Sequence, residues 1–175
     1  MNPHRPRRST EQLRESYDET LDALRRRFEQ LEWAVAQFSP DLDEEAFSAA
    51  WYSDDPPERN RADSVSSGFE KTYMLLMDLV TLSVKIAGRL GALSLDEGAS
   101  SIEVLRELRI ISQPAQDSLA VQRQVRNLSQ HVYIELTVSA LRDAVKQQLD
   151  STPRIVRDIT SWVDALTETA DGSGQ

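Results

Sequence analysis

The spacing of apolar residues between 10 and 38 constrains the fold of this chain more than any other feature. An apolar residue recurs alternately four and three positions after the last one, at Tyr17, Leu21, Leu24, Phe28, Leu31, Val35 and Phe38. This spacing is typical of a helix that packs lengthwise against other helices. Ser9 followed by Gln12 predicts a capping box at its start, and Pro40 predicts its end.

Further segments of the chain show the same helical spacing. Helices are predicted at 43–51, at 65–91, from Ser101, from Pro114, at 138–150, and from Ser151 and Pro153 onwards. The polar, proline-bearing stretch SDDPPERNRADS between the first two of these is predicted to be a loop. The helix from Pro114 is expected to bury a stripe made by Val121, Val125, Leu128, Val132 and Leu136.

No segment alternates apolar and polar residues as a half-buried strand does, and glycine is scarce, with 6 residues in 175. The sequence therefore predicts an all-α protein, an antiparallel helical bundle with a core of four helices plus extra helices. A single domain is expected over 10–168. The segments 1–9 and 169–175 are expected to be flexible tails.

The composition indicates in which compartment the protein works and which classes of partner it binds. There is no cysteine, which suits a reducing compartment, and no apolar run of the length that a membrane helix needs. We therefore expect a cytoplasmic protein without a membrane partner. The net charge of −9 argues against broad, non-specific binding to nucleic acid, and no DNA partner is expected. Neither a cofactor motif nor a cluster of metal ligands is apparent, so no cofactor is expected.

One stretch, VRNLSQHVYIEL at 125–136, combines several chemically active side chains on one predicted helix. Arg126 and Tyr133 are seven positions apart and fall on one flank of its apolar stripe, while Asn127 and His131 fall on the other flank. The only other histidine of the chain is His4. The plainest interpretation of a histidine placed in this way is a solvent-exposed side chain.

The alternative is a site for metal-independent RNA cleavage. Because a histidine side chain ordinarily titrates near neutral pH, His131 is a candidate general acid or base, and the planar charge of Arg126 can stabilise a phosphorane. Asn127 can position the histidine or a backbone phosphate. One straight helix does not bring these groups to one point, so a helix break after His131 or a two-fold dimer is required.

The pattern Arg126-Asn127-x-x-x-His131-x-Tyr133 resembles the R-x4-H-x-Y signature of HEPN domains, in the form found in HepT-type toxins. The likeness extends over about residues 65–168 and includes SSIEVLRELRIIS, LRDAV and ITSWV. The first 60 residues resemble nothing further. Many family members have an apolar pair before the histidine, where this chain has Ser129 and Gln130.

The resemblance implies a dimeric helical bundle that acts as an endoribonuclease toxin, with Arg126, Asn127 and His131 as catalytic residues. It implies an RNA substrate and a partner antitoxin, a minimal nucleotidyltransferase (MNT). In HepT-type pairs this antitoxin transfers AMP to the tyrosine of the motif, here Tyr133. The alternatives are a non-catalytic HEPN partner or substrate-binding subunit of a nucleotidyltransferase, and a plain helical adaptor.

Two carboxylates and three tryptophans are the remaining residues with a possible role at the site or in packing. Glu70 and Asp78, on the predicted helix 65–91, can face the motif and orient its side chains, or can be solvated surface charges. Trp33, Trp51 and Trp162 are predicted to pack in the core or at an interface.

Overall fold

Most of the helical residues lie where the apolar periodicity predicts helix. The structure is a computed structural model that describes residues 8–38, 41–93, 100–129 and 137–172. Within these ranges it contains α1 (Thr10–Ala36), α2 (Glu44–Trp51), α3 (Pro56–Arg89), α4 (Ser101–Glu107), α5 (Gln113–Ser129) and α6 (Val138–Gly172), and no strand. The all-α bundle predicted from the sequence is confirmed. None of these helices is long and apolar enough to cross a membrane.

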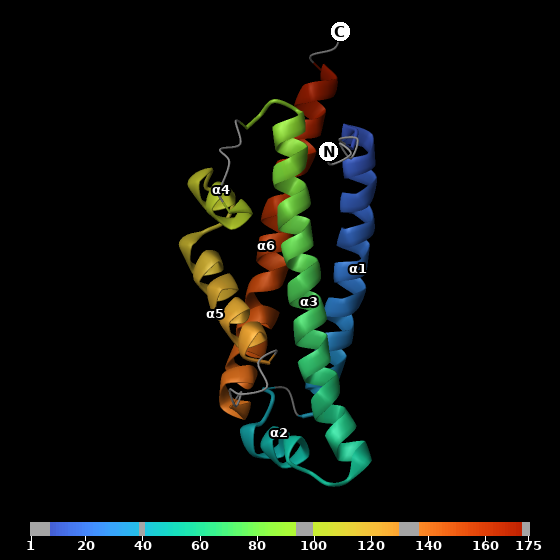
Figure 1. The fold of residues 1–175 in the computed structure, drawn as a ribbon, viewed down its shortest axis with the longest axis vertical. Helices are drawn as coiled ribbons and strands as arrows, with labels where there is room; N and C mark the ends of the chain where they lie inside the picture. The colour runs from blue at the N-terminus through green and yellow to red at the C-terminus, as the bar shows by residue number, and fades with distance from the viewer. Residues whose placement is uncertain (1–7, 39–40, 94–99, 130–136, 173–175) are drawn as a thin grey trace, which may run out of the picture.

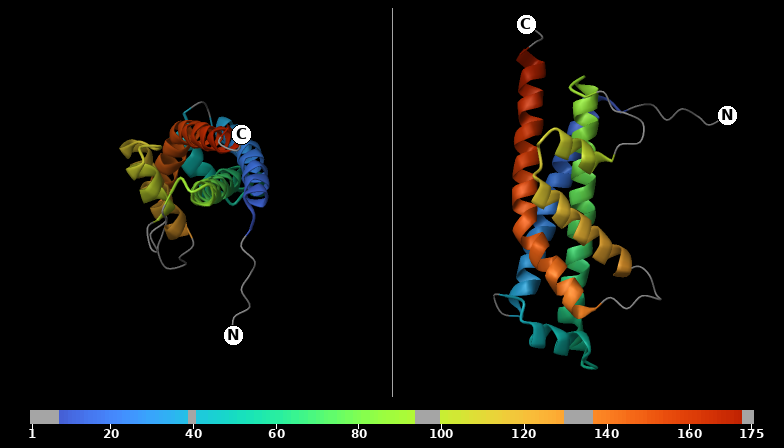
Figure 2. Two further views of the ribbon diagram at one scale, coloured as in Figure 1. Left: turned by 90° about the horizontal axis from the view of Figure 1, so that it is seen from above. Right: turned by 90° about the vertical axis from the view of Figure 1, so that its left-hand side faces the viewer.

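The long helices α1, α3 and α6 lie side by side along the length of the molecule (Figure 1). Helices α1 and α5 run in one direction, and α3 and α6 run in the other. The short helix α2 lies across one end of the bundle, while α4 and α5 lie on one side of it (Figure 2). Helix α5 packs mainly on α6 and approaches α3 near its own end. This arrangement leaves the last turn of α5 beside the middle of the bundle.

Short-range signals set several helix ends. Ser9 and Gln12 form the predicted capping box at the start of α1, and Ser100 with Glu103 forms another at the start of α4. Helix α3 is closed at Gly91, whose φ of +72° is readily adopted by glycine. The amide of Ala92 donates to the carbonyl of Ala87 at 3.0 Å, which satisfies one of the last free carbonyls of the helix.

Two proline predictions were wrong. Helix α3 begins at Pro56, so most of the segment predicted to be a loop is helical. Proline fits the first turn of a helix because the amide that it lacks has no partner there. Pro153, predicted to start a new helix, lies inside α6, which continues from Val138 to Gly172. One missing hydrogen bond is tolerated because α6 is packed on both sides of that position.

A polar layer divides the buried core into two apolar clusters. On α3, Thr72 lies between Phe69 of one cluster and Leu76 of the other, and on α5 and α6 the dividing residues are Gln122 and Gln148. Both glutamines are fully buried, and Gln148 Nε2 donates to Gln122 Oε1 at 3.0 Å. The layer also contains the buried Ser118 and Thr152, and the half-buried Ser151 accepts a hydrogen bond from Gln122 Nε2 at 3.3 Å. Polar side chains can occupy this level because most of them bond to one another.

The tryptophans differ in their surroundings. Trp51 and Trp162 are partly buried and pack against the two apolar clusters. Trp33 is 67% exposed, so it does not pack in the core of the chain, and its packing at an interface stays a prediction. Its side chain lines a surface groove between α1 and α3, together with Asn60 and Asp63.

Candidate functional site

The described part of the R-N-x-x-x-H-x-Y motif lies in the last turn of α5. Arg126 and Asn127 belong to this turn, which ends at Ser129. His131 and Tyr133 lie outside the described residues, so the structure places neither of them. The site can therefore be built only from α5 and from the helices that surround its end.

Arg126 is half-buried and turned towards α3. Its Nε is inaccessible to solvent and has no hydrogen-bond partner among the described residues. A buried arginine N–H without a hydrogen-bond partner lowers the stability of the fold. An acceptor oxygen that bonds to this N–H forms a strong, charge-assisted hydrogen bond. The guanidinium can thus bind an anion, which is the task that the sequence assigns to it.

Tyr73 of α3 is the aromatic neighbour of this arginine. Its side chain is buried, and burial raises the pKa of its phenol above the ordinary value. The positive charges of Arg123 and Arg126 act on the phenol in the opposite direction, which places both guanidinium groups near it. Arg123 and Arg126 are one helical turn apart, so one tyrosine can lie against both.

Asn127 is exposed and lines a groove between α4 and α5. The volume of the groove is about 520 Å³. Its lining combines apolar and polar residues: Ser100, Ile102, Glu103, Gln116, Leu119, Ala120, Arg123, Gln124, Asn127 and Leu128. Since successive helical residues are about 100° apart, Arg126 faces α3 while Asn127 faces this groove. The two residues therefore lie on neighbouring but different surfaces of α5.

Glu70 of α3 lies at the end of α5. Its Oε1 accepts a hydrogen bond from the hydroxyl of Ser129 at 2.5 Å, and that hydroxyl also lies 2.7 Å from the carbonyl oxygen of Arg126. Ser129 thus connects α5 to α3. Asp78, the other carboxylate considered in the sequence, is exposed two turns further along α3.

The buried face of α5 differs from the predicted stripe. Of the predicted residues that the structure describes, only Val125 is fully buried, while Val121 and Leu128 are half-buried. The buried positions are instead Ala115, Ser118, Leu119, Gln122 and Val125. The face is rotated because Gln122 finds hydrogen-bond partners inside the bundle, where an unpaired glutamine is strongly disfavoured.

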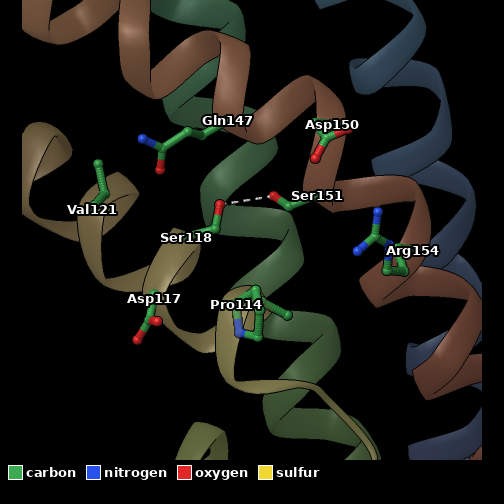
Figure 3. Close-up of a pocket in the computed structure, with 9 residues that line it drawn as sticks. Pro114, Asp117, Ser118, Val121, Gln147, Asp150, Ser151 and Arg154 are labelled. Atoms are coloured by element: carbon green, nitrogen blue, oxygen red, sulfur yellow. Dashed lines mark hydrogen bonds between the residues drawn. The ribbon is translucent and has the colours of Figure 1, made fainter.

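A second groove lies on the opposite side of α5, between α5 and α6. Its volume is about 430 Å³. Figure 3 shows Ser118 and Ser151 meeting across it, with Ser118 Oγ donating to Ser151 Oγ at 3.0 Å. Asp117 and Asp150 lie around it, and Arg154 is the one arginine of its lining. This groove contains none of the described motif residues.

The comparisons with known proteins identify no relative. No family model, no curated protein and no solved structure matches this chain. The fold therefore defines the protein as an all-α helical bundle, and its residues alone carry the functional argument.

Tyr73 and Gln116 are site residues that the sequence did not single out. Tyr73 fits the apolar stripe of α3, so its spacing predicts only packing. Gln116 lies ten residues before Arg126 on a helix rich in glutamine, and nothing in its spacing distinguishes it. The uneven distribution of charge is the one available signal, because four arginines lie between 106 and 126 in an acidic chain.

Proposed function

We propose that this protein is a HepT-like endoribonuclease that cleaves RNA without a metal ion. The observation that carries the proposal is the half-buried guanidinium of Arg126, whose Nε lacks a described partner, at the start of the Arg-x4-His motif. Nε itself is closed to solvent, so an anion of RNA bonds it after a shift of this half-buried side chain. The resemblance to HEPN domains, which the same arginine helps to carry, favours the same chemistry.

In the proposed reaction, His131 accepts the proton of a ribose 2′-hydroxyl as that oxygen attacks the adjacent phosphorus. The bond from phosphorus to the 5′-oxygen breaks, and a protonated histidine of a second copy donates a proton to the leaving oxygen. The products are a 2′,3′-cyclic phosphate and a 5′-hydroxyl. Arg126 stabilises the charge on the phosphorane, and Asn127 holds the strand.

We further propose that two copies of the chain form the site. Arg126 and Asn127 face different sides of α5, so one helix end does not surround a phosphate. A two-fold axis near the end of α5 brings a second motif to the first. Sedimentation at micromolar concentration is expected to give a dimer. A monomer that cleaves RNA contradicts the proposal that two copies form the site.

The proposed partner is an MNT-type nucleotidyltransferase that acts as antitoxin. The net charge of −9 favours the alternative, a non-catalytic subunit that binds such an enzyme and no RNA. The test described below separates these two functions, because only the first requires cleavage by the isolated protein.

The deciding experiment incubates the purified protein with single-stranded RNA in the presence and absence of EDTA. Cleavage is expected in both, with 2′,3′-cyclic phosphate ends. Arg126→Ala and His131→Ala are each expected to reduce the rate at least a hundredfold, the size typical of a lost acid–base or charge-stabilising group. Arg154→Ala, which removes an exposed arginine from the opposite groove, is the matched control and should cleave normally. Absence of cleavage by the wild-type dimer contradicts the nuclease function.

A further inference from the structure

The groove between α4 and α5 ends at the motif and has the chemistry of a nucleotide subsite. Asn127 and Leu128 line one part of it, and Gln116 lines it three turns earlier on α5. Its volume of about 520 Å³ falls within the range of about 300–1,000 Å³ that is usual for small-molecule sites. The groove can therefore hold a nucleotide next to the motif.

Arg123 is the cation of this groove. It is exposed, lines the groove, and forms no ion pair with any residue that the structure describes. Glu103, the acidic residue of the lining, accepts hydrogen bonds from the backbone amide of Ser100 at 3.0 Å and thereby closes the start of α4. Since its carboxylate is engaged in this cap, the positive charge of Arg123 remains available to an anion.

The two arginines of α5 are arranged for two successive phosphates. Arg123 and Arg126 differ by three residues, so their Cα atoms are separated by a rise of about 4.5 Å along the helix axis. Both lie near enough to Tyr73 of α3 for their charges to act on its phenol. A strand whose scissile phosphate binds Arg126 passes Arg123 when it continues into the groove.

Gln116 shows that the groove lacks a hydrogen-bond donor. Its Oε1 is buried and accepts no hydrogen bond from a described residue, although buried amide oxygens are normally paired. The side chain as a whole is half-buried and lines the groove, so a rotation of its amide presents Oε1 to the N–H groups of a nucleobase. The apolar side chains Ile102 and Leu119 lie in the same groove and can pack against the base.

From these observations we infer that the groove between α4 and α5 binds the nucleotide that flanks the scissile phosphate of a single-stranded RNA. Arg123 binds its phosphate, and Gln116 accepts a hydrogen bond from its base. This assignment rests on the proposed ribonuclease function, but it concerns binding and can be tested without cleavage.

The test measures the dissociation constant of a fluorescent eight-nucleotide RNA, using the full chain with His131→Ala to prevent cleavage. Adding Arg123→Gln is expected to lower the slope of log affinity against log salt by about 0.7, the value for one phosphate contact on a single strand. Adding Arg154→Gln instead removes the same charge from the opposite groove and should leave the slope unchanged.

A second pair of variants tests the base contact. Gln116→Met is expected to weaken binding about fivefold, the factor for one hydrogen bond, without changing the salt slope. Gln147→Met, in the opposite groove, is the control. An RNA that ends at the scissile phosphate should be insensitive to both groove variants, because it leaves the subsite empty.

The possible outcomes separate the two proposals. Equal salt slopes for the Arg123 and Arg154 variants overturn the groove assignment, even when the wild-type protein cleaves RNA. Binding that depends on Arg123 and Gln116 supports the groove even when no cleavage is found. Absence of RNA binding by the His131→Ala protein overturns the assignment outright.

Discussion

The hydroxyl of Ser129 lies 2.5 Å from Oε1 of Glu70, so the last residue of α5 is bonded to the middle of α3. The same hydroxyl lies 2.7 Å from the carbonyl oxygen of Arg126. This polar contact fixes the turn that carries Arg126.

The first prediction concerns this contact. Ser129→Ala is expected to lower the free energy of unfolding by about 1–2 kcal/mol, because a partly buried carboxylate loses a hydrogen-bond donor. Urea denaturation measures the change. In a double-mutant cycle, Ser129→Ala combined with Glu70→Gln should cost less than the two single changes together.

Strict additivity in that cycle contradicts a direct bond between the two side chains. Ser64→Ala provides the control, since this exposed serine bonds only to a carbonyl of its own helix at 2.7 Å. Removing the hydroxyl of Ser64 should lower the free energy of unfolding much less than removing that of Ser129.

The second prediction concerns the polar layer of the core. Gln148 Nε2 donates to Gln122 Oε1 at 3.0 Å and to the carbonyl oxygen of Phe69 at 3.2 Å. Gln148→Met should therefore destabilise the protein by about 1–3 kcal/mol, because it leaves buried acceptors without a donor. The double variant Gln122→Met/Gln148→Met should lose less free energy of unfolding than the two single variants lose together. Thermal or urea unfolding of the four proteins tests this, and a double loss larger than the sum contradicts it.

The third prediction is a loss of stability at alkaline pH. Burial raises the pKa of both Tyr17 and Tyr73 in the folded protein above the ordinary value of 10.0. Above that pH the unfolded chain has lost protons that the folded chain still holds, so the free energy of unfolding falls as pH rises. Below that pH the phenols are protonated in both the folded and the unfolded chain, so these two residues cause no change of the free energy of unfolding with pH. Denaturation between pH 8 and 11 should show a shallower fall for Tyr73→Phe than for the wild type. An identical fall in both proteins contradicts the pKa shift of Tyr73.

Helix content was predictable because its signals are local. The apolar spacing of α1 and the capping box of Ser9 and Gln12 need no knowledge of the rest of the chain. Prolines were misread because their effect depends on position. Pro56 fits the first turn of α3, and Pro153 is carried within α6 by packing on its neighbours. Sequence patterns do not contain that tertiary information.

The surroundings of the motif were less predictable than its residues. The sequence placed Arg126 and Asn127 on opposite flanks of a helix, and in the structure they face α3 and the α4–α5 groove. It did not predict that Gln122 would replace Leu128 in the buried face. A glutamine is buried only where partners satisfy it, and the distant partners of Gln122, which are Gln148 and Ser151, lie on α6.

The final prediction concerns Tyr133, which lies outside the described residues and belongs to the motif by sequence. If the protein is a HepT-type toxin, a cognate nucleotidyltransferase with ATP should add adenylate to Tyr133 and stop RNA cleavage. The physical reason is that each AMP brings a negative phosphate and a bulky base close to Arg126. The phosphate competes for the guanidinium whose Nε has no described partner, and the base obstructs the RNA.

Tyr133→Phe should remain folded and active but escape this inhibition, because phenylalanine has no hydroxyl to accept the adenylate. Tyr73→Phe is the matched control and should still be modified, since the buried Tyr73 is not the expected acceptor. Intact-mass spectrometry after incubation with the partner and ATP measures the addition. An unchanged mass for the wild type, or an equal increase for Tyr133→Phe, shows that Tyr133 is not the modified residue.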